Sequence, residues 1–168
     1  MTKMNIYLIE DYMKEAEQII NKFRQMAEKR ENKYLFCIEH LKGTKNTIYE
    51  GLERDFYELG VLKQIEDLYA QSERKREKMG ILLDVLLTEE DMDSMYSSYY
   101  PQAELARRIY QEFHNRIPIY MITNTATFAV QSDVIMGVDL SDAFIAKDAL
   151  LKYELEKEIE KMFHYYEK

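Results

Sequence analysis

The sequence is poor in residues that cross-link a chain or interrupt its regular structure. Among 168 residues there are one cysteine, two prolines, five glycines and no tryptophan. The lone cysteine, Cys37, excludes an internal disulfide and fits a reducing compartment. No linker, internal repeat or low-complexity tract divides the chain. We therefore expect residues 1–168 to form a single domain with one core.

Long apolar runs and an excess of basic charge are also missing. No run approaches the roughly 20 apolar residues that a membrane helix needs. The first residues lead straight into an apolar segment without a signal-peptide pattern, so we expect a cytoplasmic protein with no membrane partner. The formal charge is −8, from 23 basic and 31 acidic residues. This balance argues against a general nucleic-acid binder, which needs a basic face to neutralise phosphates.

Short apolar runs alternate with amphipathic segments along most of the chain. The runs predict strands, and apolar residues spaced three or four apart predict helices. The expected strands are residues 5–9, 34–38, 79–87, 117–122 and 143–146. The expected helices are residues 12–30, a helical insertion at about 45–78, 101–115, a short helix ending near 137, and 151–163. This alternation predicts an α/β fold, (βα)5, with a doubly wound parallel five-stranded sheet.

The segment of residues 45–78 is unusually long for the second helix of such a fold. Its apolar stripe predicts one extended helix, or two helices broken near Gly60, projecting beyond the sheet. Such an arm could bind a partner or a second copy of the chain. The alternative is a helix folded back on the core. Residues 88–99 form a second departure, an extra acidic loop rich in serine and tyrosine.

Polar residues follow four of the expected strands. Glu10 and Asp11 end the first, Asp84 lies near the end of the third, and Thr123 and Lys147 follow the fourth and fifth. The carboxyl ends of parallel strands share one edge of the sheet, where ligands collect. Three carboxylates gathered there repel one another unless a cation neutralises them, and oxygen ligands suit Mg²⁺. A lysine and a hydroxyl at the same edge suit a transferred phosphoryl group.

These strand ends resemble the response-regulator receiver domains of two-component signalling, the CheY-like family. Residues 8–11 (LIED) look like the family's opening acidic pair, and residues 81–84 (ILLD) like its phosphoacceptor strand. Residues 121–123 (MIT) and 144–147 (FIAK) match the strands with the hydroxyl and the lysine. The resemblance covers the chain apart from roughly residues 45–78 and 88–99. It implies a flavodoxin-like sheet order, 2-1-3-4-5.

The resemblance also implies a chemistry. Asp84 would accept a phosphoryl group from a histidine kinase or a phosphotransfer protein. Glu10, Asp11 and Asp84 would bind Mg²⁺, and the backbone carbonyl of Leu86 would complete the protein ligands. Any enzymatic activity would be limited to self-phosphorylation and autodephosphorylation at Asp84.

The remaining matched residues would read the phosphorylated state. Thr123 and Lys147 would hold the phosphoryl oxygens, and Phe144 would turn inward as the switch residue. No output domain follows the fifth strand, so signalling would pass to a downstream protein by direct contact, with a homodimer as a further possibility.

Two other interpretations stay open. Asp148 stands where the family usually has proline, and Asn124 could crowd the site. These residues favour a receiver-like interaction or dimerisation module that uses the long helix of residues 45–78 and needs no phosphorylation. A phosphotransferase or phosphatase of another aspartyl-phosphate class would need a second carboxylate two residues after Asp84, where Leu86 stands. The three histidines show no ligand spacing, so no zinc site is expected.

Overall fold

The computed structural model describes residues 3–10, 13–29, 34–41, 60–84, 104–123, 144–147 and 155–167. Within these ranges five parallel strands form one sheet in the order β2-β1-β3-β4-β5. The strands are β1 (Met4–Ile9), β2 (Phe36–His40), β3 (Lys78–Asp84), β4 (Ile119–Thr123) and β5 (Phe144–Ala146). The helices are α1 (Met13–Ala27), α2 (Val61–Lys75), α4 (Glu104–Phe113) and α8 (Leu155–His164), followed by the 3-10 turn η3 (Tyr165–Glu167). The predicted α/β class with a parallel sheet is confirmed.

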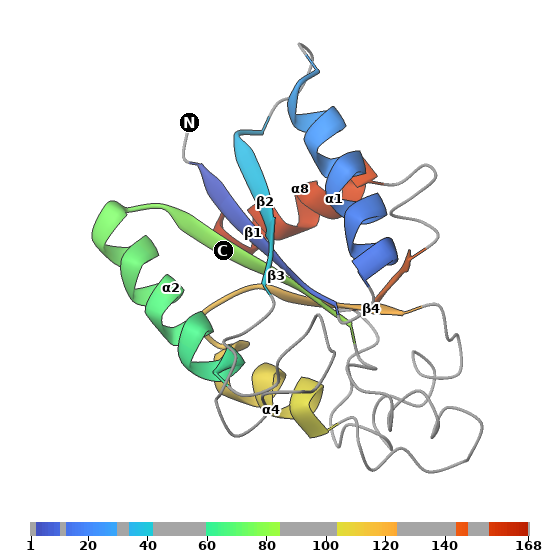
Figure 1. Cartoon of the computed structure of the whole chain (residues 1–168). Helices are drawn as coiled ribbons and strands as arrows, with labels where there is room; N and C mark the ends of the chain where they lie inside the picture. Colours follow the sequence, from blue (N-terminus) through green and yellow to red (C-terminus); the bar gives the residue numbers. More distant parts are fainter. Residues whose placement is uncertain are drawn as a thin grey trace, which may run out of the picture.

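Helices cover both faces of this sheet, with α1 and α8 on one side and α2 and α4 on the other (Figure 1). Along the central strands, successive side chains point alternately to the two faces of the sheet. In β3, Leu82 packs with α1 and α8, while Ile81 and Leu83 pack with α2 and α4. A strand buried on both sides reads as a continuous apolar run, which is why β1 and β3 were visible in the sequence.

The strand boundaries differ from those predicted. The second strand was expected at 34–38, but β2 runs from Phe36 to His40. The third was expected at 79–87, and β3 begins one residue earlier, at Lys78, which pairs with Met4 of β1. Gly80 lies inside the strand, where it is in register with Ile6 of β1. A Cβ built on it would lie 2.5 Å from Cε at the end of the Met162 side chain in α8, so the glycine leaves room for this methionine and does not mark a turn.

The second helix also needs correction. Helix α2 begins after Gly60, whose backbone has the left-handed φ of 84°, and it ends at Lys75. Residues 78–84 form β3, so the predicted helical insertion does not extend to residue 78. Val61 and Ile65 are buried in the core, so α2 folds back on the sheet and does not project from it. The remainder of the predicted insertion, residues 45–59, lies outside the described residues.

Other predicted elements are only partly covered by the described ranges. Helix α1 is shorter than the predicted 12–30, and the last helix begins at residue 155 within the described part. Pro101, the loop at 88–99 and the short helix expected before residue 137 lie outside the described residues. None of the described helices has the length and apolar character needed to cross a membrane.

The end of the chain is anchored to β3. The first residues of β3 extend beyond β4 on that side, since the pairing between the two strands begins only at Ile81. Tyr166 of η3 takes the position of the missing strand partner: Met79 N–H donates to its hydroxyl oxygen at 3.1 Å. The Tyr166 hydroxyl in turn donates to the Met79 carbonyl. One phenol thus satisfies both backbone groups of a buried strand residue.

Candidate functional site

Two carboxylates lie side by side at the carboxyl edge of the sheet. Strands β1 and β3 are neighbours, and Ile9 is in register with Leu83, so Glu10 and Asp84 occupy equivalent positions one residue further on. Each follows an α1-facing residue by two positions, which directs both side chains toward the α1 and α8 face. Both side chains are buried, at 1% and 6% exposure.

Lys147, the residue after β5, brings a positive charge to the same point. Its Nζ lies 2.7 Å from Oε2 of Glu10 and 3.1 Å from Oδ2 of Asp84. Its side chain is only 9% exposed. Lys147 follows Ile145 by two positions, and Ile145 packs with the same α1 and α8 core. The same alternation that directs the two carboxylates therefore directs the lysine to them.

A third carboxylate comes from the helix that covers this face. Glu15 lies in the first turn of α1, and its Oε2 is 2.7 Å from Nζ of Lys147. Its side chain is 29% exposed, so it lies at the water-facing side of the cluster. This contact could not be predicted from the sequence, because a glutamate in the first turn of a helix is common for reasons of helix electrostatics alone.

The cluster carries more negative than positive groups. One ammonium faces the carboxylates of Glu10, Glu15 and Asp84. Burial and the adjacent Asp84 raise the pKa of Glu10 from 4.5 to about 10. Burial alone would lower the pKa of Lys147, but Asp84 and Glu10 raise it above the usual lysine range. Glu10 therefore holds a proton at neutral pH until further positive charge arrives, while Lys147 stays charged.

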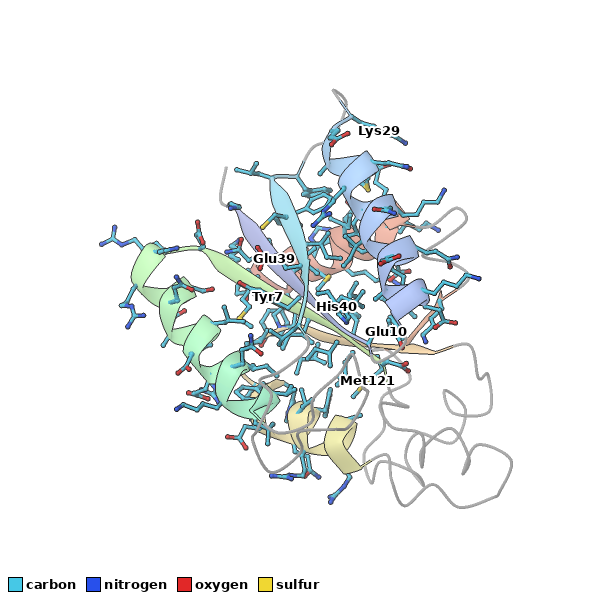
Figure 2. The ribbon with its side chains drawn as sticks, in the orientation of Figure 1. Tyr7, Glu10, Lys29, Glu39, His40 and Met121 are labelled. Carbon is cyan, nitrogen blue, oxygen red and sulfur yellow. The ribbon has the colours of Figure 1, made fainter. Side chains whose placement is uncertain are left out.

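A histidine that the sequence analysis set aside also lies at this edge. His40 is the last residue of β2, and its Nε2 is 2.6 Å from the backbone carbonyl oxygen of Glu10. Figure 2 shows both residues labelled at the ends of their neighbouring strands. The contact fixes the backbone where β1 ends. Its position at a strand end was visible in the sequence, but its partner was not.

The other predicted site residues are placed less completely. Thr123 is the last residue of β4 and is in register with Ala146, so its backbone lies at the same edge, one position from that of Lys147. Phe144 is the first residue of β5, in register with Met121. Asp11 and Leu86 lie outside the described residues. The structure thus joins Glu10, Asp84 and Lys147 directly, as predicted.

The donor set fits a magnesium ion in its chemistry. Mg²⁺ in proteins takes one or two carboxylates and keeps several waters, and Glu10 and Asp84 supply two adjacent ones. The surplus of negative charge and the raised pKa of Glu10 both show that this point lacks positive charge. Among the described residues no group of three or more histidine, cysteine, aspartate or glutamate side chains is placed to hold a metal ion.

The sulfur and the other two histidines lie elsewhere. Cys37 is in the middle of β2 and donates from Sγ to Oδ1 of Asn5 at 2.9 Å. His114 Nδ1 lies 2.9 Å from the carbonyl oxygen of Tyr110, within one helix end. His164 lies 3.7 Å from Glu160 on the surface of α8. None of these contacts brings a second histidine or a cysteine to the cluster of Glu10, Glu15, Asp84 and Lys147.

Comparison with known proteins adds no relative: no family model, no curated protein and no solved structure matches the chain.

Proposed function

We propose that the chain is a receiver-like phosphoacceptor that takes a phosphoryl group on Asp84. The observation that supports this most strongly is the buried contact of Lys147 with Asp84 and Glu10 at the carboxyl edge of the sheet. A phosphoryl group placed on Asp84 would meet an ammonium that is already within hydrogen-bond distance. The sheet order and the helices on both faces agree with a flavodoxin-like (βα)5 domain.

The chemistry of the step is a displacement at phosphorus. A carboxylate oxygen of Asp84 forms a bond to phosphorus, and the bond from phosphorus to the donor breaks, with its electron pair leaving on the donor. With a phosphohistidine donor the leaving group is the imidazole of the partner kinase or phosphotransfer protein. With acetyl phosphate it is acetate. Lys147 and Thr123 hold the phosphoryl oxygens and stabilise their charge.

Glu10, Asp11 and Asp84, with the backbone carbonyl of Leu86, would hold Mg²⁺ in this scheme. When bound, the ion supplies the positive charge that neutralises the phosphoryl oxygens. The protein's own contribution is to bury Glu10 and Asp84 side by side, which makes the point attractive to a divalent cation. Loss of the Glu10 proton accompanies this binding, because its carboxylate must be ionised to act as a ligand.

The output follows from the same geometry. Phe144 begins the strand that carries Lys147, so a pull on Thr123 and Lys147 would reach the β5 surface. We propose that this surface then binds a downstream protein or a second copy of the chain. A cytoplasmic location follows from the proposed partners.

The experiment is to incubate the full chain with Mg²⁺ and acetyl phosphate and to measure its intact mass. The expected result is a shift by one phosphoryl group that is absent from Asp84→Asn and absent when EDTA replaces Mg²⁺. Glu39→Gln, a change at an exposed residue of β2, is the matched control and keeps the shift. An unmodified wild-type chain at saturating donor would overturn the proposal.

A second candidate is an interaction module with the same fold and no phosphorylation. One observation favours it: Lys147 already has ion pairs with the three carboxylates, so the cluster can persist as a purely structural feature. The two proposals differ in one measurement. Partner binding or dimerisation that is equal in wild type and Asp84→Asn, with no mass shift in either, supports the module.

A further inference from the structure

Lys147 uses its hydrogen-bonding capacity on carboxylates. Its Nζ donates hydrogen bonds to Oε2 of Glu15 at 2.7 Å and to Oδ2 of Asp84 at 3.1 Å, and it forms an ion pair with Oε2 of Glu10 at 2.7 Å. A phosphoryl oxygen on Asp84 would have to compete with these oxygens for the same nitrogen. Which carboxylate leaves, and at what cost, then affects how readily Asp84 is phosphorylated.

The three carboxylates differ in their freedom to leave. Glu10 is 1% exposed, and the backbone at that position is held by the contact with His40. Asp84 is the acceptor of the phosphoryl group and cannot move away from it. Glu15 is 29% exposed and projects from the first turn of α1, so its carboxylate can turn into water. Of the three contacts with Lys147, the one with Glu15 is the most exposed to water, so breaking it costs the least free energy.

We propose that Glu15 is a positioning residue that competes with the phosphoryl group of Asp84 for Nζ of Lys147. The inference rests on the proposed phosphoacceptor function. In the unphosphorylated chain Glu15 holds the lysine, and its charge lies next to the place where the phosphoryl charge arrives. Like charges at this distance repel, so Glu15 lowers the rate and the extent of phosphorylation. Glu15 is the part of the cluster that opposes the reaction.

This opposition has a use in a signalling protein. A small phosphodonor brings no contacts to α1, so it has to displace Glu15 by mass action alone. A protein donor that docks beside the first turn of α1 could supply a positive group to Glu15 and release Lys147. Glu15 would thus favour phosphorylation by a docked protein over phosphorylation by small metabolites.

The test compares Glu15→Gln with wild type in the acetyl phosphate reaction with Mg²⁺. The initial rate of Asp84 phosphorylation at subsaturating donor should rise about fivefold, a size expected for removing one partly screened like charge. Glu17→Gln removes the same charge from an exposed position of the same helix and should leave the rate unchanged. Raising the salt concentration should shrink the difference between Glu15→Gln and wild type.

A second measurement separates this role from a structural one. The urea midpoint of unfolding is measured without donor for the same proteins. A residue that only supports the fold would lower both the midpoint and the phosphorylation rate when changed, whereas the proposed competition raises the rate while the midpoint falls or stays. Glu15→Ala, which also removes the hydrogen-bond acceptor, should raise the rate at least as much as Glu15→Gln.

The outcomes distinguish the two proposals. If wild type is phosphorylated and Glu15→Gln, Glu15→Ala and Glu17→Gln all react at the wild-type rate, the role of Glu15 is overturned and the proposed function stays in place. A lower rate in both Glu15 variants would overturn it as well. A wild-type chain that takes no phosphoryl group on Asp84 would overturn the proposed function, and the role of Glu15 with it.

Discussion

The polar side chains at the two ends of the sheet differ in how their charges and hydrogen bonds are balanced. At the carboxyl end, Glu10, Asp84 and Lys147 are ionisable side chains that face one another with 9% exposure or less. At the amino end, Asn5 Nδ2 donates to Oε2 of Glu77 at 2.7 Å, and Cys37 donates to Asn5. The first arrangement leaves charge unbalanced, while the second pairs donors with acceptors.

The two ends therefore differ in how easily their contacts can change. The cluster of Glu10, Glu15, Asp84 and Lys147 can change its contacts when a cation or a phosphoryl group arrives, because its charges are not balanced. The hydrogen bonds around Asn5 and the Tyr166 contact on Met79 hold the strands in place at this end. Substitutions at the two ends should therefore behave differently.

The largest effect is expected when the positive charge of the carboxyl end is removed. Lys147→Met leaves the carboxylate of Asp84 buried without a counter-charge and removes the ammonium beside Glu10, and it should lower the free energy of unfolding by about 3–5 kcal/mol at pH 8. Urea denaturation measures this loss. Adding Asp84→Asn to Lys147→Met should recover part of it, since one uncompensated charge is then gone.

An exposed ion pair provides the control for this prediction. Glu66 pairs with Arg116 at 3.0 Å, and their side chains are 50% and 34% exposed. Glu66→Gln should lower the free energy of unfolding far less than Lys147→Met, because water screens this exposed pair. A cost for Lys147→Met as small as that for Glu66→Gln would remove the distinction between the two ends.

At the amino end, the largest effect is expected from Tyr166→Phe. The change removes one hydroxyl and leaves the N–H and the carbonyl of Met79 without this partner, at a cost of about 1–3 kcal/mol. Tyr165→Phe is the matched control, because the Tyr165 hydroxyl makes one contact, to the carbonyl of His114 at 3.2 Å. Thermal unfolding should show a clearly larger loss for Tyr166→Phe than for Tyr165→Phe, and equal losses would contradict the role given to Tyr166.

The pH dependence of stability gives a further test of the carboxyl end, and here the direction of the change is what decides. The pKa of Glu10 rises from 4.5 to about 10 on folding, so the folded chain holds a proton that the unfolded chain releases between these values. Glu10 therefore makes the free energy of unfolding fall as pH rises through this window. Glu10→Gln removes this contribution, so its stability should fall less with pH than that of wild type.

Urea titrations between pH 5 and pH 9 measure this difference. The two proteins should be closest in stability at the acid end, and Glu10→Gln should gain relative to wild type at the alkaline end. A wild-type stability that rises relative to Glu10→Gln across this range would contradict the raised pKa.

The smallest effect is expected from Cys37→Ser at the amino end. The serine hydroxyl can make the same donation to Asn5 that the thiol makes, so the free energy of unfolding should change by less than about 1 kcal/mol. Alkylation of Cys37, which blocks the donation and adds volume, should cost more. A Cys37→Ser variant as unstable as Lys147→Met would show that the hydrogen bonds of the amino end are as sensitive as the charges of the carboxyl end.

Much of the fold was visible in the sequence, because strands buried on both faces are continuous apolar runs. The sequence is less informative where tertiary contacts decide. Gly80 is an internal residue of β3 that makes room for Met162, a contact that its sequence neighbours do not indicate. The apolar stripe before Lys75 fits both a projecting arm and a helix folded back on the core, and Val61 and Ile65 pack into the core. A periodic stripe shows that a helix has an apolar face but does not show what covers that face.

The candidate site was visible only where residues follow strands. Glu10, Asp84 and Lys147 could be brought together by counting positions along parallel strands that share one edge. Glu15 could not, because its contact depends on how α1 crosses the sheet. His40 was visible as a strand-end residue. Its ring contacts a backbone carbonyl, and because every residue has one, this partner could not be predicted from the sequence.

The contact of Met162 with Gly80 has a consequence for how the sheet assembles. Slipping β3 by one residue along β1 would bring Met79 or Ile81 under the Met162 methyl group, where even a Cβ would lie 2.5 Å away. The same slip would carry the Met79 backbone away from Tyr166. Helix α8 and the turn after it thus favour the observed alignment of the central strand, and with it the position of Asp84 at the carboxyl edge of the sheet.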